Sequence, residues 1–145
     1  MSIWLRYLAI VAFVGNGLTA LWNLIALGRM IVHGSLAGGI DRLALNLFFS
    51  LAAIILATLI AAPAQRDVSL RTKFIAVPSV LGGALGILST AIWLYQRADL
   101  PQISVSTETL VIELFVMERA VQTAFFSACT LALAILVLAS RRSSA

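Results

Sequence analysis

The sequence predicts an all-α integral membrane protein, a four-helix bundle that forms a single four-span transmembrane domain over residues 1–145. Hydrophobic residues make up 61% of the chain and charged residues 11%, whereas soluble domains contain roughly 45–50% and 25%. Four apolar runs also reach the roughly 20 residues that a helix needs to cross a bilayer. The spans are expected at about 3–27, 43–62, 74–95 and 120–140, with the last helix extended at its outer end from about 107.

The first span, 3–27, carries the amides of Asn16 and Asn23 on one helical face, together with alanines and a threonine. Lipid provides no hydrophobic force between helices, so small residues and hydrogen-bonding amides mark the faces at which helices meet. This face is therefore predicted to contact other helices. The run continues without an A-x-A-like cleavage site, which distinguishes it from a cleaved signal peptide.

Residues 28–40 contain four glycines and are expected to form an apolar loop rather than a helix. The second span, 43–62, ends directly before Pro63. It repeats the pattern of the first span, because Asn46 and Ser50 share a face with two alanines. Both polar faces are predicted to point into the bundle.

The third span, 74–95, contains Gly82 and Gly86 in a G-x-x-x-G pattern, with a serine and a threonine on the same face. This spacing lets two helix backbones approach closely. Gly82 and Gly86 are therefore predicted to lie at a helix crossing. Gly86→Leu is expected to destabilise the bundle more than Gly15→Leu, since Gly15 lies off the polar face of the first span.

The last helix is predicted to start near Thr107, which is a suitable N-cap residue. A helix from Thr107 to Ser140 would be about 50 Å long, longer than the bilayer core of about 30 Å. Its outer part mixes glutamates with large apolar residues and has no clean amphipathic face. We expect this part to be covered on several sides, in part by the loop at 28–40.

The positions of Lys and Arg beside the spans predict the orientation, because cytoplasmic segments carry an excess of them. Six lie at the two termini and in the second connection, namely Arg6, Arg66, Arg71, Lys73, Arg141 and Arg142. Three lie beside the other two connections, namely Arg29, Arg42 and Arg97. Both termini are therefore expected in the cytoplasm, with the protein in the plasma membrane of a bacterium.

Several function classes are not supported by the residues present. The basic residues form no stripe, so nucleic acid is not expected as a partner. His33 is the only histidine and Cys129 the only cysteine, which argues against a metal or haem site within one chain. No nucleophile elbow, zinc-protease or phosphate-binding motif occurs, so neither a catalytic residue nor a cofactor is predicted.

Two main functional hypotheses remain, and an intramembrane enzyme comes third. The first is an accessory, scaffolding or assembly subunit. In this interpretation the outer half of the last helix is apolar because another membrane protein, or a second copy, covers it. The candidate partner-binding residues are Glu113, Phe115, Met117 and Glu118.

The alternative is a small oligomeric channel or transporter with a polar pathway between its helices. The candidate pathway residues are Asn16, Asn23, Asn46, Arg119 and Gln122. For Arg119 two environments are open: an interfacial pair with Glu118, or a position facing the bundle beside an acid from another segment. The two hypotheses differ in whether the polar faces enclose a water-accessible cavity or pack without one.

Overall fold

The computed structural model describes the backbone of residues 3–34, 39–62, 69–98 and 107–140, and their side chains except at 98 and 107–115. This part of the chain forms four helices and no strand: α1 (Ile3–Val32), α2 (Ile40–Ala61), α3 (Leu70–Ala98) and α4 (Thr107–Ala139). Each helix is long and apolar enough to cross a membrane. The predicted all-α membrane bundle is confirmed.

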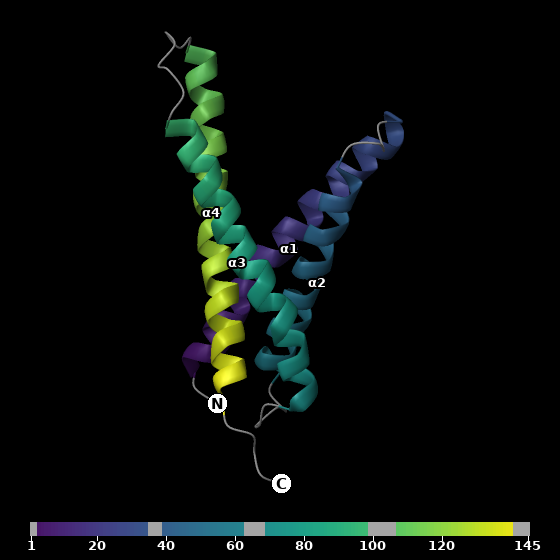
Figure 1. Cartoon of the computed structure of the whole chain (residues 1–145), viewed down its shortest axis with the longest axis vertical. Coiled ribbons are helices and arrows are strands. Elements are labelled where there is room, and N and C mark those ends of the chain that lie inside the picture. Colours follow the sequence, from purple (N-terminus) through teal and green to yellow (C-terminus); the bar gives the residue numbers. More distant parts are fainter. Residues whose placement is uncertain (1–2, 35–38, 63–68, 99–106, 141–145) are drawn as a thin grey trace.

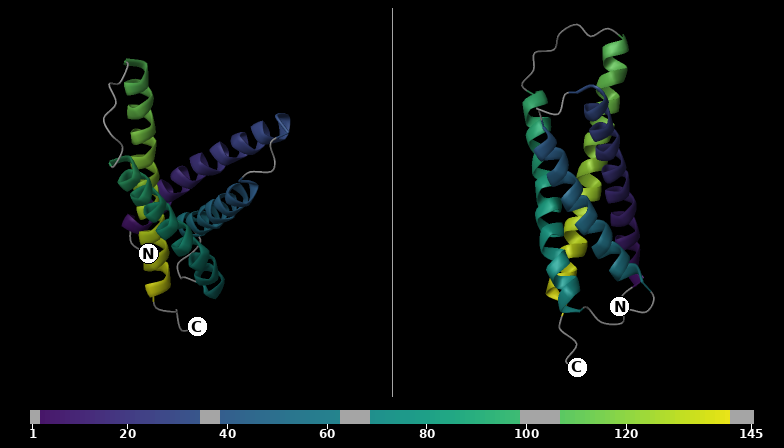
Figure 2. Two further views of the ribbon diagram at one scale, coloured as in Figure 1. Left: turned by 45° about the horizontal axis from the view of Figure 1, so that its top comes forward. Right: turned by 90° about the vertical axis from the view of Figure 1, so that its right-hand side faces the viewer.

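The four helices form two hairpins arranged as a V (Figure 1). α1 packs mainly on α2, and α3 packs mainly on α4. The start of α1, the end of α2, the start of α3 and the end of α4 lie together at what we call the closed end, whereas the hairpins diverge toward the open end (Figures 1 and 2). The backbones of the two arms are therefore separated only in the open half (Figure 1).

Two helix boundaries differ from the sequence prediction by four residues or more. α1 continues through Gly28, which was expected to begin a loop, and ends where Gly34 takes a positive φ of 65°. A single helical glycine costs only about 1 kcal/mol relative to alanine, and good helix formers follow it here. α3 begins at Leu70 rather than near Phe74, because the Ser69 hydroxyl accepts a hydrogen bond from the Thr72 N–H at 3.3 Å and caps the first turn.

The closed end is a dry core of small and aliphatic side chains. Ala9 and Ala12 of α1 have no exposed surface, and each of the other helices contributes fully buried neighbours. These are Leu56, Ala57, Ile60, Ala76, Leu133, Ala134 and Val137. At the same end the Lys73 ammonium donates to the carbonyl oxygens of Leu138 at 3.3 Å and Ser140 at 2.5 Å, which links α3 to the last turn of α4.

Glycines permit close approach at three crossings. A Cβ at Gly82 would lie 2.7 Å from Cβ of Phe49 on α2, whereas one at Gly86 would overlap Ser127 on α4, so the two glycines serve different neighbours. Gly15 is also buried, and a Cβ there would overlap the ring of Phe126. The expectation that Gly15 lies away from the helix contacts was wrong. α4 crosses α1 on the side of Gly15, next to the face that carries Asn16, and brings Phe126 against the glycine.

The glycine contacts predict a clear order of stability. Gly15→Leu and Gly86→Leu should each destabilise the bundle by about 1–3 kcal/mol, because the added side chain forces two helices apart. Gly17→Leu is the matched control, since nothing lies within 4 Å of a Cβ at that position. Unfolding in detergent, followed by circular dichroism, measures the three differences. Equal stability of Gly15→Leu and Gly17→Leu would contradict the α1–α4 crossing.

The orientation can be measured with two cysteines on one helix. Leu70 and Gln96 are exposed at opposite ends of α3, and neither substitution alters the pattern of charges. In a Cys129→Ser background, an impermeant thiol reagent added to intact cells should label Gln96→Cys and leave Leu70→Cys unlabelled. The reverse pattern would place the closed end outside the cell and contradict the expected topology.

Candidate functional site

A cavity of about 500 Å³ lies in the open half of the V, and all four helices contribute to its wall. Gly82, Gly83 and Gly86 border it without side chains, whereas four large apolar residues frame it, namely Leu45, Phe49, Leu85 and Phe126. The polar residues of the wall are Asn16, Thr19, Arg42, Asn46, Ser50, Ser79, Ser89, Thr123, Ser127 and Thr130. This volume lies within the range of roughly 300–1,000 Å³ that is typical of sites for small molecules.

Most hydroxyl groups of the wall donate to carbonyl oxygens of their own helix. Thr19 donates to Gly15 at 3.0 Å, and Thr123 donates to Arg119 at 2.8 Å. Ser79, Ser89 and Thr130 make the same kind of bond, at 2.9–3.0 Å. Such bonds satisfy serine and threonine within a membrane helix. A hydroxyl oxygen that donates in this way can still accept a hydrogen bond.

The floor of the cavity joins the two arms through a hydrogen bond between amide and hydroxyl. Nδ2 of Asn16 donates to Oγ1 of Thr130 on α4 at 2.7 Å, and also to the carbonyl oxygen of Ala12 at 2.8 Å. In lipid such an interhelical bond contributes about 0.6–2 kcal/mol. Asn16 therefore both lines the cavity and connects α1 to α4.

Arg42 and Asn46, by contrast, present unused hydrogen-bonding groups. They lie one turn apart on α2, Arg42 at the open end and Asn46 deeper, and both line the cavity. Neither has a hydrogen-bond or ion-pair partner within the described part of the chain. Both side chains are exposed, so their hydrogen-bonding groups are available to water or to a bound molecule.

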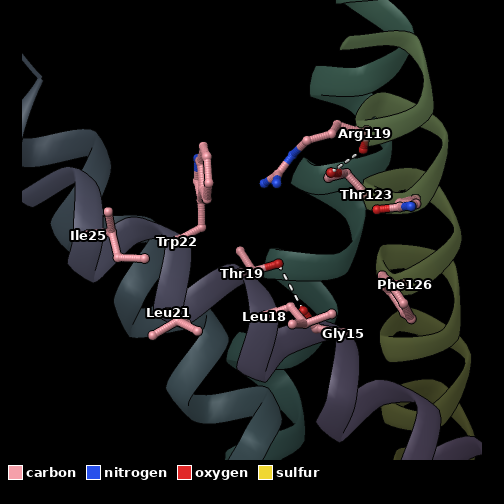
Figure 3. Close-up of a pocket in the computed structure, with 10 residues that line it drawn as sticks. Gly15, Leu18, Thr19, Leu21, Trp22, Ile25, Arg119, Thr123 and Phe126 are labelled. Atoms are coloured by element: carbon pink, nitrogen blue, oxygen red, sulfur yellow. Dashed lines mark hydrogen bonds between the residues drawn. The ribbon is translucent and has the colours of Figure 1, made fainter. Parts of the chain in front are cut away.

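A second cavity of about 170 Å³ adjoins the first, between α1 and α4. Arg119 points across it toward α1, and its guanidinium carbon lies 4.2 Å from the ring centroid of Trp22 (Figure 3). A cation over an indole face is attracted by the ring quadrupole. Arg119 therefore faces the bundle, but its partner is an indole rather than the acid that was considered, and Glu118 instead accepts a hydrogen bond from Gln122 at 3.1 Å.

The candidate pathway residues separate into two groups. Asn16 and Asn46 line the larger cavity, while Arg119 and Gln122 line the smaller one. Asn23 lines neither: it is 8% exposed and donates to the carbonyl oxygen of Thr19 at 3.0 Å. Because α1 and α2 pack closely along this face, the second amide of the stripe is used for packing.

The candidate partner-binding residues are only partly described. The side chains of Glu113 and Phe115 lie outside the described residues. Met117 and Glu118 are exposed. The ends of α1 and α2 that flank residues 35–38 lie on the opposite arm of the V from the outer end of α4 (Figure 1). They do not cover α4, contrary to expectation.

Sequence reasoning missed several residues of the two cavities. Trp22 was not singled out, although an aromatic ring facing an arginine is a common pair. Arg42 was counted only for orientation, and Ser127 was not among the candidate residues. His33, whose role was left open, is exposed in the turn after α1, and Cys129 is half-buried within α4.

No protein family, no characterised protein and no solved structure with which the chain was compared matches it. A functional assignment for this chain therefore depends on the geometry of the two cavities and on the charges around them.

The contact between Trp22 and Arg119 should be measurable as a coupling. The double variant Trp22→Leu/Arg119→Gln is expected to lose about 1 kcal/mol less unfolding free energy than the sum of the losses in the two single variants. The reason is that each single substitution already removes the same cation–π contact. A double-mutant cycle of unfolding in detergent measures this difference. Trp22→Leu with Arg42→Gln is the control pair and should be additive. Additivity in both pairs would remove the contact from the description of the site.

Proposed function

We propose that this membrane protein binds a small polar solute in the larger cavity and acts as a channel or transporter for it. The observation that carries the proposal is the cavity of about 500 Å³ between the arms, bordered by polar residues from all four helices. Packing without a cavity would have favoured a purely structural role. An open, polar space at membrane depth instead supports a solute site.

The closed end supports a transporter more than a permanently open channel. Fully buried side chains of all four helices pack together there, below the floor at Asn16 and Thr130. A solute in the cavity is therefore accessible from one side only. Passage would require the arms to move about the closed end, as in alternating access, in which gating segments move around a central site.

The cavity is also not fully enclosed by one chain. A pathway for a polar solute must be separated from the surrounding hydrocarbon. We therefore infer that a second copy, or another membrane protein, covers the lateral opening. The open end would face the outside of the cell, in keeping with the distribution of Lys and Arg.

A second candidate function, an accessory or assembly subunit, is favoured by the length of α4. Its 33 residues correspond to about 50 Å, which exceeds the bilayer core by several turns. The outer end stands clear of α1 and α2 (Figure 2). Met117 and Val121 are at least half exposed near it, and a partner protein could bind there.

Adjacent cysteines on α2 test whether the cavity contains water. Ser50 lines the cavity, whereas Leu51 at the same depth points away from it and is 52% exposed. In a Cys129→Ser background, a small water-soluble thiol reagent added from outside should modify Ser50→Cys at least tenfold faster than Leu51→Cys. The reason is that thiolates form in water and are strongly disfavoured in hydrocarbon.

Equal and slow modification at the two positions would show a dry cavity and contradict the solute site. The accessory function is tested separately, by co-purification of partner proteins from native membranes. Loss of a co-purifying membrane protein in Met117→Asp but not in Leu51→Asp, combined with a dry cavity, would favour the second candidate.

A further inference from the structure

The charges around the two cavities have one sign. Arg42 lines the larger cavity, and Arg119 lines the smaller one, which shares Thr19, Thr123 and Phe126 with it. No aspartate or glutamate occurs among the described residues that line either cavity. Walls of low dielectric constant around charges of one sign concentrate their field in the cleft. The two arginines of the walls therefore favour an anion over a cation in the space between the arms.

The two arginines differ in how far their charge is already used. The guanidinium of Arg119 lies over the Trp22 ring, whereas Arg42 has no partner within the described part of the chain. The described acids at this end line neither cavity: Asp41 lies beside Arg42 on α2, and Glu118 accepts a hydrogen bond from Gln122, a residue of the smaller cavity. A free guanidinium presents a planar set of donors that matches carboxylate and phosphate oxygens.

Below Arg42 the wall continues with further unused donors. Asn46 and Ser50 follow at successive turns of α2, each about 6 Å deeper than the last. Ser127 of α4 also lines the cavity, and none of these three side chains has a hydrogen-bond partner among the described residues. An amide and two hydroxyls thus lie below one guanidinium, on helices of both arms.

We propose that the solute of this cavity is a small water-soluble organic anion, with a carboxylate or phosphate group at Arg42 and a hydrogen-bonding part at Asn46. The inference rests on the proposed solute site and adds the chemical class of its ligand. An anionic phospholipid shares the head-group chemistry. With its phosphate at Arg42, however, its acyl chains would lie against the amide of Asn46 and the hydroxyl of Ser50, which favours a soluble anion.

The potential can be measured without knowing the ligand. The probes are an anionic reagent, 2-sulfonatoethyl methanethiosulfonate, and its cationic analogue with a trimethylammonium group. The measured quantity is the ratio of the anionic to the cationic modification rate, in a Cys129→Ser background. This ratio should be higher at Ser50→Cys than at the exposed Gln96→Cys. Arg42→Gln should lower this ratio about a hundredfold, because one charge about two turns away at an effective dielectric constant near 20 changes each of the two rates about tenfold, in opposite directions. Arg29→Gln, an equal charge change outside the cavity, should leave it unchanged.

Ligand binding is then tested by protection of Ser50→Cys with three compounds of one chain length. Glutarate should slow the modification, whereas the neutral glutaramide and the cationic 1,5-diaminopentane should not, and Arg42→Gln or Asn46→Leu should remove the protection.

The outcomes separate the two proposals. Rapid modification with no charge preference, or protection by the neutral or cationic compound, would overturn the anion assignment while leaving the solute site in place. Failure of both reagents at Ser50→Cys in zwitterionic nanodiscs would contradict the solute site itself. Modification that is blocked only in nanodiscs containing phosphatidylglycerol would overturn the soluble ligand in favour of a phospholipid.

Discussion

Close packing of small side chains at the closed end is the constraint on which the rest of the structure depends. Ala9 and Ala12 of α1 meet Ala57, Ala76 and Ala134 of the other helices without exposed surface. In lipid, where no hydrophobic force presses helices together, such contacts hold helices by van der Waals packing. Because the fully buried cluster joins all four helices at this end, the hairpins are held together there and diverge at the other end (Figure 1).

Where the hairpins diverge, the polar groups between them need hydrogen-bond partners. Between the arms, hydroxyl groups of α1, α3 and α4 bond to their own helices, and Asn16 bonds across to Thr130. At the open end Arg119 is held by the face of Trp22. Only a few groups remain unused, chiefly the guanidinium of Arg42 and the amide of Asn46. Their position in a cavity, rather than their presence in a span, is what supports a functional role.

The same arrangement relates the two candidate functions. A solute site closed at one end needs movement of the hairpins for transport, and the closed end is the natural hinge because few groups there would lose partners. The long α4 forms part of the cavity wall through Ser127 and Thr130, and it also projects beyond the bundle. A partner bound to its outer turns would therefore be mechanically connected to the cavity.

The sequence by itself determined the class of the protein, the number of helices and the faces that they bury. Hydropathy and length are local properties, so the four spans follow from composition, and the faces of Asn16 and Ser50 follow from the helical period. The role of Gly15 did not follow, because it depends on which side α4 crosses. The prediction that a loop begins at Gly28 was wrong, because a single glycine is a weak helix breaker.

Only the tertiary structure decided which polar residues share a space. Asn16 and Asn23 look equivalent along the chain. Asn16 lines the cavity, whereas Asn23 is buried and donates to a carbonyl oxygen of its own helix. Arg42 lines a cavity whose other walls come from distant helices, and Trp22 faces Arg119 of α4. Both arrangements depend on the angle between the hairpins. That angle results from the packing of residues far apart along the chain, and a helical period in one segment carries no information about it.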